Sequence, residues 1–179
     1  LTMADDPQND FNSTQFNGAG ILSYTRTAAY VDGTAGDDVK IFSTGRNIYT
    51  NTATFAAGGV VSHNVLSGSG RDSITTAGGT DTVRAGAGAD TIITAAGNDF
   101  IYGGSGGDSI QIGAGNDFVE GGGGNDTVDG TGGGGAGNDY RTDSTGDDHI
   151  TLAGGSDTIL PGAGADTVNS GGGADSSGA

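Results

Sequence analysis

The stretch GAGNDFVEGGGGNDTVDG, residues 113–130, contains one nine-residue pattern twice in succession. In both copies an aspartate, Asp117 or Asp126, has a glycine two residues before it and a valine two residues after it. Glycine tolerates positive φ and close backbone approach, so the residues before the aspartate predict a tight turn. The three residues after it place one apolar side chain between two outward ones, which is typical of a short strand. Each unit is therefore predicted to be a turn followed by a strand.

The same unit fills the C-terminal two thirds of the chain. Twelve aspartates keep the spacing of nine residues, and the one longer gap, from Asp126 to Asp139, is thirteen residues and holds a glycine-rich insertion of four around Thr131 to Gly134. Ten of the twelve have Ile or Val two residues later. The glycines two residues before the aspartates are Gly70, Gly79, Gly88, Gly97, Gly106, Gly115, Gly124, Gly137, Gly146, Gly155, Gly164 and Gly173.

Two units bring the chain back to its starting side, so we expect two repeats per coil and coils stacked about 4.8 Å apart, as adjacent strands are. Every unit then lies against the unit two further on, and Val83 faces inward while Thr82 and Arg84 face outward. The result is an all-β solenoid with two edges of turns. The first edge carries Asp72, Asp90, Asp108, Asp126, Asp148 and Asp166; the second edge carries Asp81, Asp99, Asp117, Asp139, Asp157 and Asp175.

The composition excludes several classes of partner. Among 179 residues there are 39 glycines, no cysteine and no tryptophan, so neither disulfides nor a large conventional core is expected. The net charge of -16 repels nucleic acid and anionic membranes. No apolar run approaches the roughly 18 residues of a membrane span, so no transmembrane segment is expected. Cations are the natural partner of such a chain.

A column of carboxylates repels itself unless cations lie between its members. Oxygen ligands in this number favour calcium, because magnesium prefers a smaller octahedron with retained waters and zinc prefers nitrogen and sulfur ligands. Counting stacked pairs predicts about ten calcium sites and a chain that folds only with calcium. The candidate ligands are the carboxylates of the twelve aspartates and the turn carbonyls of Gly70, Gly79, Gly88, Gly97, Gly106, Gly115, Gly124, Gly137, Gly146, Gly155 and Gly164, with Gly86, Gly104, Gly113, Gly122, Gly135 and Gly162 four residues before an aspartate.

These units resemble the RTX (hemolysin-type) nonapeptide repeat, GGxGxDxUx with U a large aliphatic residue, over about residues 67 to 179. The resemblance implies a right-handed parallel β-roll, a form of β-helix, with calcium as cofactor, secretion by a type I exporter and folding on extracellular calcium. It implies no single activity, because such arrays are attached to toxins, proteases, lipases, polysaccharide epimerases, adhesins and surface-layer proteins. A single lysine, no cysteine and abundant Thr, Ala and Gly look most like the surface-layer (S-layer) and adhesin members.

The expected function is a non-enzymatic, calcium-binding structural module of a secreted or cell-surface bacterial protein, with self-association or a cell-surface polysaccharide as candidate further partners. One alternative is the exported C-terminal module of a secreted enzyme or toxin. Another is an ice-binding repeat, which would need threonine three residues before each aspartate, where Thr145 alone supplies it. The G-x-S-x-G pattern around Ser105 lies inside the repeat frame with no helix expected after it, so no catalytic residue is predicted. His63 and His149 are expected at the surface.

One departure from the repeat and one recurring outward position lead to further predictions. Arg141 takes the inward position of its unit, so we expect a bulged coil in which Tyr140 turns inward as a substitute. On the outside, Phe100, Phe118 and Tyr140 recur at the same position of alternate units and should form an aromatic strip, with Tyr102 nearby. The strip either packs against the N-terminal segment or a neighbouring subunit, or stiffens the roll by cross-strand stacking alone.

Residues 1–66 lack the register and are predicted to form an irregular, β-rich cap or linker in front of the β-roll of residues 67–179, with a separate module as the alternative. Asp38 follows a degenerate repeat turn and is expected in a solvated surface turn, with metal binding as the weaker interpretation. The β-prone runs are Ile21 to Tyr24, Val39 to Phe42, Asn47 to Thr50 and Val60 to Leu66.

Overall fold

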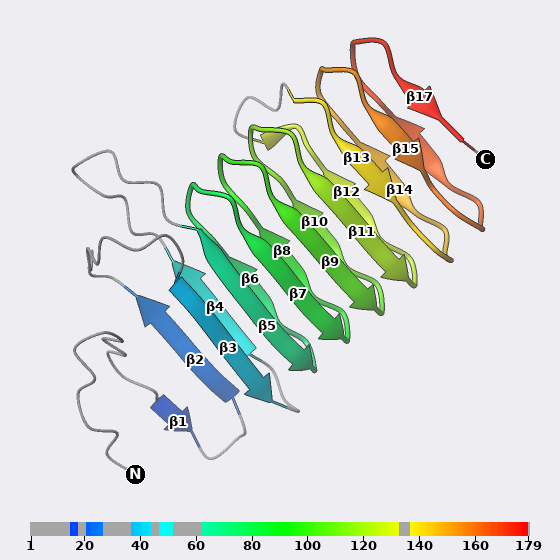
Figure 1. Ribbon diagram of the computed structural model, residues 1–179. Helices are drawn as coiled ribbons and strands as arrows, with labels where there is room; N and C mark the ends of the chain where they lie inside the picture. The colour runs from blue at the N-terminus through cyan, green and yellow to red at the C-terminus, as the bar shows by residue number, and fades with distance from the viewer. Residues whose placement is uncertain are drawn as a thin grey trace.

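In the computed structural model, the chain forms successive coils whose strands make up two sheets that face each other (Figure 1). The structure describes residues 62–132 and 137–178 in full, and upstream of them only the backbone of the strands at residues 15–17, 21–26, 37–43 and 47–51. From the second strand onward, successive strands alternate between the two sheets. Within these residues no helix is long and apolar enough to cross a membrane.

Among the described residues, the two sheets contain nine and eight strands, and all neighbouring strands are parallel except β1 and β2. The nine-stranded sheet consists, in order, of β1 (Gln15–Asn17), β2 (Ile21–Arg26), β4 (Asn47–Asn51), β6 (Ser73–Thr75), β8 (Thr91–Ile93), β10 (Ser109–Gln111), β12 (Thr127–Asp129), β14 (His149–Thr151) and β16 (Thr167–Asn169). The eight-stranded sheet consists of β3 (Asp37–Ser43), β5 (His63–Ser69), β7 (Thr82–Ala87), β9 (Phe100–Ser105), β11 (Phe118–Gly123), β13 (Tyr140–Thr142), β15 (Thr158–Leu160) and β17 (Ser176–Ser177).

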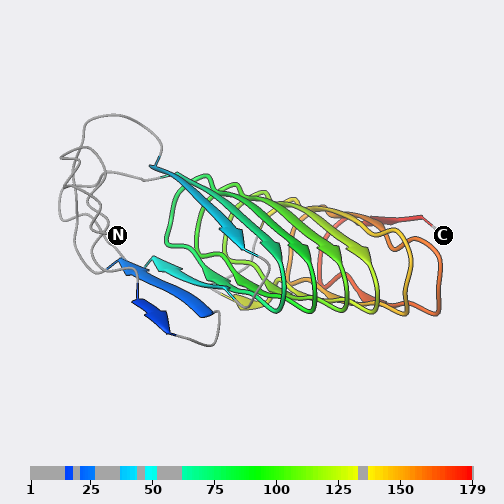
Figure 2. The same ribbon diagram turned by 90° about the horizontal axis from the view of Figure 1, so that it is seen from below.

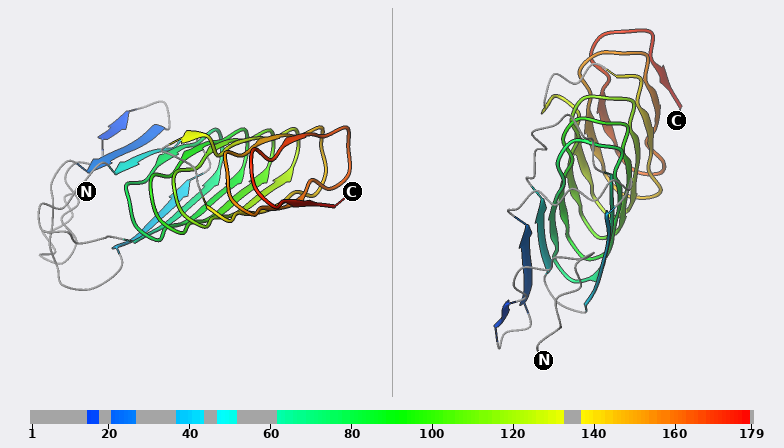
Figure 3. Two further views of the ribbon diagram at one scale, coloured as in Figure 1. Left: turned by 90° about the horizontal axis from the view of Figure 1, so that it is seen from above. Right: turned by 60° about the vertical axis from the view of Figure 1, so that its left-hand side comes forward.

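The register of the strands repeats with every coil. Ile110 pairs with Ile92 on one side and with Val128 on the other, so each strand lies against the strand one full coil away. The pairing of Phe118 with Tyr140 keeps this register across the insertion. Figures 2 and 3 show the coils from β5 to β17 following one another along a single axis. The predicted all-β parallel roll, with each unit on the unit two further on, is confirmed.

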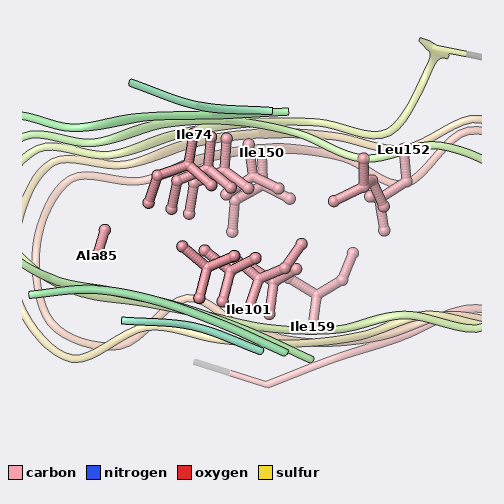
Figure 4. Packing of buried hydrophobic residues seen from close by; sticks show 13 residues of the cluster. Ile74, Ala85, Ile101, Ile150, Leu152 and Ile159 are labelled. Carbon is pink, nitrogen blue, oxygen red and sulfur yellow. The ribbon is translucent and has the colours of Figure 1, made fainter. Parts of the chain in front are cut away.

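The core is a double row of apolar side chains between the sheets. Figure 4 shows Ile74 and Ile150 from the nine-stranded sheet facing Ile101 and Ile159 from the eight-stranded sheet. These side chains are at most 1% exposed. Burial of each such side chain stabilises the folded state by about 1.5–3 kcal/mol. The buried apolar residues are Val65, Ile74, Val83, Ala85, Ile92, Ile101, Ile110, Ile112, Val119, Val128, Ile150, Leu152 and Ile159.

The outward face of the eight-stranded sheet carries the predicted aromatic strip. The rings of Phe100 and Phe118 stack with centroids 6.3 Å apart, and those of Phe118 and Tyr140 with centroids 5.4 Å apart. Tyr102 leans on Phe118 at 5.7 Å, and the guanidinium of Arg84 lies 4.6 Å from the Tyr102 ring centroid. Cross-strand aromatic and cation–π pairs of this kind stiffen a sheet surface.

The prediction of a bulged coil at Arg141 is wrong. Arg141 pairs in register with Val119 and Ile159 and is 1% exposed, whereas Tyr140 remains outward at 39% exposure. Strand alternation forces neighbouring side chains to opposite faces, and the stack on Phe118 keeps Tyr140 on the outer one. The extra residues of the insertion are accommodated between β12 and β13 instead.

The predicted N-terminal runs coincide with strands β2, β3 and β4 and with part of β5; Val60 and Val61 lie outside the described residues. These strands pair in parallel with those downstream, so both sheets extend upstream of residue 62. The predicted boundary between residues 66 and 67 falls within β5, and the division into cap and roll stays a prediction. Asp38 lies in β3 opposite Asn64, so its expected place in a surface turn is wrong.

Candidate metal centre

On the first edge, each aspartate is tied to the next coil by the same hydrogen bond. The backbone N–H of Asp72 donates to Oδ1 of Asp90 at 2.8 Å, and the N–H of Asp90 donates to Oδ1 of Asp108 at 2.9 Å. The spacing therefore predicted the column correctly, and the insertion does not interrupt it. The bond recurs from Asp108 to Asp126, from Asp126 to Asp148 and from Asp148 to Asp166, at 2.7, 2.8 and 3.0 Å.

The second edge repeats this arrangement half a coil away. The N–H of Asp81 donates to Oδ1 of Asp99 at 2.9 Å. The carboxylates of each edge therefore point along the axis toward the preceding coil, as a file of anions. The same bond links Asp99 to Asp117, Asp117 to Asp139, Asp139 to Asp157 and Asp157 to Asp175, at 2.9, 2.9, 2.9 and 3.0 Å.

The second oxygen of most of these carboxylates has no protein partner. Ten of the twelve aspartates are buried, and only Asp166 and Asp175, at the C-terminal end, are partly exposed. A buried carboxylate oxygen without a hydrogen bond is costly, so each such atom indicates a partner that the polypeptide does not provide. Oδ2 is buried and has no hydrogen-bond partner in Asp81, Asp90, Asp99, Asp108, Asp117, Asp126, Asp148 and Asp157.

The turn glycines allow the coils to approach closely. Gly88 has φ +135°, and a Cβ there would lie 1.6 Å from the carbonyl oxygen of Gly70. Turn carbonyl oxygens of one coil thus lie against the next, but their role as metal ligands stays a prediction. Gly113 and Gly137 lie in turns without positive φ, and Gly135 lies outside the described residues. Among the glycines named in the sequence analysis, positive φ occurs at Gly70, Gly79, Gly86, Gly88, Gly97, Gly104, Gly106, Gly115, Gly122, Gly124, Gly146, Gly155, Gly162, Gly164 and Gly173.

Burial shifts the proton affinity of both columns. It raises the pKa of Asp99 to about 7 and the pKa values of Asp108, Asp117 and Asp126 to about 6. The pKa of Asp90 is also raised, first by burial and further by the charge of Asp72. Without a cation these carboxylates therefore resist ionisation, because burial disfavours the charged form. A bound cation would reverse this preference and hold them as anions.

The donor chemistry of the columns fits calcium. Carboxylate oxygens from successive coils, close to turn carbonyls, supply the hard oxygen ligands that calcium prefers. Zinc prefers nitrogen and sulfur ligands. Among the described residues of the two columns, only His63 has such a ligand atom in its side chain. A calcium ion between coils would give the unpaired Oδ2 atoms a partner and would neutralise the repulsion along each edge.

The prediction that His63 lies at the surface is wrong. His63 is 3% exposed, its backbone N–H donates to Oδ1 of Asp81 at 2.8 Å, and its Nδ1 lies 2.7 Å from the same oxygen. His63 stands eighteen residues before Asp81, one full coil, so it occupies an aspartate position of the second edge. Extending the period upstream would have found it. His149 is exposed on β14, as predicted.

Arg141 brings a positive charge into the second edge. Its Nη2 lies 3.5 Å from Oδ2 of Asp139, and its guanidinium nitrogens are buried without hydrogen-bond partners. Burial lowers the pKa of Arg141, while the charges of Asp139, Asp117 and Asp157 oppose this shift. Arg141 therefore compensates part of the negative charge of Asp139, Asp117 and Asp157 on the second edge.

Asp143 is a further acidic residue that the periodic aspartates did not indicate. Carboxylate oxygens of Asp126, Asp143 and Asp148 all lie within 4.8 Å of one another, and all three residues are buried. The available signal is its position: it stands five residues before Asp148, where the two preceding coils of this edge have Gly103 and Gly121.

Comparison with known proteins agrees with this geometry. The family model for the RTX calcium-binding nonapeptide repeat matches residues 64–92, 75–110, 102–133, 134–168 and 142–176. No curated protein and no solved structure matched the chain. The matched segments cover more than half of the sequence and contain every aspartate of both columns. The chain therefore belongs to the RTX calcium-binding nonapeptide repeat family, and its β-roll is a calcium-binding repeat module.

Proposed function

We propose that this chain is a non-enzymatic structural module of a secreted or cell-surface bacterial protein, which folds when it meets extracellular calcium. About ten calcium ions would lie between successive coils along the two edges. The observation that carries the proposal is the file of buried Oδ2 atoms without hydrogen-bond partners. Such a file is unstable as a set of anions and becomes a set of ligands when divalent cations are present.

Self-repulsion supports calcium-dependent folding. The chain carries a net charge of -16, and the buried columns bring many of the negative charges into line. Without cations the free energy of the compact state is raised by this repulsion and by the desolvation of the carboxylates. If calcium binds the folded state and not the unfolded state, the free energy of calcium binding stabilises the fold, as in other metal-dependent folds.

The test is a calcium titration of the full chain in chelated buffer, followed by circular dichroism. We expect little β-structure without calcium, a cooperative gain on titration and loss on renewed chelation. Magnesium serves as the control, because its preference for octahedral geometry with retained waters does not match these turns. A chain equally folded in chelator, or folded as well by magnesium, contradicts the proposal.

The titration midpoint tests the proposed location. A module that folds outside the cell needs affinity only in the range of extracellular calcium modules, with a dissociation constant of about 10⁻⁴–10⁻³ M. A midpoint far below that range would indicate a site that fills inside the cell and would argue against folding after export.

A further inference from the structure

The coil after the insertion differs from the others at one point of the first edge. Five residues before each aspartate of this edge, the chain has small or apolar residues in the neighbouring coils, Gly121 before Asp126 and Pro161 before Asp166, but Asp143 before Asp148. We propose that Asp143 joins Asp126 and Asp148 in a three-carboxylate calcium site, which binds more tightly than the other sites of this edge and clamps the roll across the glycine insertion. The inference rests on the proposed function and deepens it.

The three carboxylates border one small space. A Cβ added at Gly121 would lie 2.5 Å from Oδ2 of Asp143 and 2.7 Å from Oδ2 of Asp126. Both oxygens therefore face the volume that the absent side chain of this glycine leaves open. At the equivalent point one coil earlier, a Cβ added at Gly103 would meet Oδ2 of Asp108 at 2.5 Å, with no second carboxylate among the nearest atoms.

The other oxygen of Asp143 is anchored by the backbone. Its Oδ1 accepts hydrogen bonds from the N–H of Gly122 at 3.0 Å and from the N–H of Ser144 at 2.8 Å. These two bonds hold the carboxylate in one orientation and leave Oδ2 directed at the cluster. The site is thus preorganised by the same turn that carries the coil from β13 toward β14.

Unpaired oxygens in the cluster point to a missing cation. Asp126 is 1% exposed and Asp148 is 2% exposed, and Oδ2 of each is buried without a hydrogen-bond partner. Asp143 is 8% exposed. The buried guanidinium of Arg141 has its charged neighbours, Asp139, Asp117 and Asp157, on the second edge, so it does not neutralise this group. Three buried carboxylates at this separation require a cation with a charge of two or more if they are to be ionised together.

The position explains why a tighter site would be useful here. The gap between Asp126 and Asp139 is the only one that departs from the period, so the coil closed by Asp126 and the coil closed by Asp148 are joined by a longer, glycine-rich connection. A cation held by Asp126 from one coil and by Asp143 and Asp148 from the next would fix the register of these coils. Ligand charge count is one of the properties that set calcium affinity, so the third carboxylate raises it.

Calorimetric titration with calcium alone, on the full chain, tests the inference. The variants are Asp143→Asn, which keeps the shape and removes the charge, and Asp143→Gly, which restores the residue of the two preceding coils. The matched control is Asp147→Asn. Asp147 is exposed, and its Oδ1 accepts the N–H of Ala165 at 2.9 Å. One coil earlier Asn125 accepts the N–H of Asp147 in the same way at 3.0 Å, so asparagine suits this position.

Both Asp143 variants should weaken the tightest class of calcium sites by roughly tenfold or more, while the control keeps wild-type affinity. The remaining sites should still fill, and β-structure at saturating calcium should be retained. Wild-type affinity in a folded Asp143 variant would overturn the inference and leave the proposed function intact. A wild-type chain that binds no calcium would overturn the proposed function itself.

Discussion

Most aspartates of the repeat have two separate tasks in this fold. Oδ1 accepts a backbone N–H from the preceding coil, as Asp117 does from Asp99 at 2.9 Å, and so contributes to the stacking of the coils. Oδ2 of the same residue is buried without a partner and is left for a cation. One side chain therefore links coil stacking to ion binding, which explains why the aspartate recurs in every unit while its neighbours vary.

The glycine two residues before the aspartate is required by the close approach of the coils. At Gly88 the backbone has φ +135°, and an added Cβ would lie 1.6 Å from the carbonyl oxygen of Gly70, which cannot move without shifting its coil. We expect Gly88→Ala to lower the free energy of unfolding in calcium by at least about 2 kcal/mol, because strain in φ and a backbone clash add together. Chemical denaturation at saturating calcium measures this effect.

Gly78→Ala is the control for this substitution. An added Cβ at Gly78 meets only the carbonyl oxygen of Ala96, at 3.2 Å, and Ala96 itself shows that alanine is accepted one coil further on. The control should change the free energy of unfolding by less than about 1 kcal/mol. Equal losses in the two variants would show that a methyl group at position 88 causes no special clash and that the coils are less tightly stacked.

At the scale of single elements, β13 is exceptional because it buries a charge in the row where β5 to β12, β14 and β15 bury Ile or Val. Arg141 lies between Val119 and Ile159, and its only ion pair among the described residues is with Asp139, at 3.5 Å. A buried charge that is incompletely hydrogen-bonded contributes little stability by itself. Its value is local: it offsets the negative charge of the second edge beside the insertion.

We therefore expect Arg141→Val to make the protein more dependent on calcium. In saturating calcium the free energy of unfolding should change little, because the bound ions compensate the charge of Asp139 and the variant no longer buries a guanidinium without hydrogen-bond partners. In chelator the variant should retain less β-structure than wild type, because Asp139 loses its compensating charge. Thermal unfolding in both buffers measures this, and an equal loss in both would show a simple packing role for the arginine side chain.

At the scale of the whole molecule, the raised pKa values make the calcium-free roll sensitive to pH. The pKa is about 7 for Asp99 and about 6 for Asp108, Asp117 and Asp126, against about 3.9 for an aspartate in an unfolded chain. The folded state thus binds more protons than the unfolded state between about pH 4 and pH 7. The protonated carboxyl groups therefore stabilise the folded state relative to their ionised forms. This contribution is fully present below about pH 4 and is lost as the pH rises to about 7.

In chelator, β-structure should therefore increase on acidification from pH 7.5 to about pH 4.5, and the reduced net negative charge acts in the same direction. With calcium the trend should be opposite, because protons compete with the ion for the same carboxylates and the apparent affinity falls as the pH is lowered. Circular dichroism in both buffers across this range is the measurement. An increase of β-structure with pH in the absence of calcium would contradict the raised pKa values of these aspartates.

Most of the fold could be predicted because a strict period of nine allows few arrangements. Alternation within each strand placed Val83 inward, and the return of the chain after two units placed Asp90 next to Asp72 and Asp108. These are consequences of local geometry repeated without drift, and nothing distant in the chain is needed to derive them.

Contacts between residues at different positions of the repeat could not be predicted from the sequence and were found only in the tertiary structure. The period reaches His63, but its two contacts with Asp81 appear only in the structure. The outward place of Tyr140 follows from its stack on Phe118. The meeting of Asp143 with Asp126 and Asp148 depends on how one turn closes over another. The sequence by itself determined which residues recur on each edge, because period and alternation are properties of the local chain. The tertiary structure decided which of the exceptional residues face one another, because that depends on how neighbouring coils fit together.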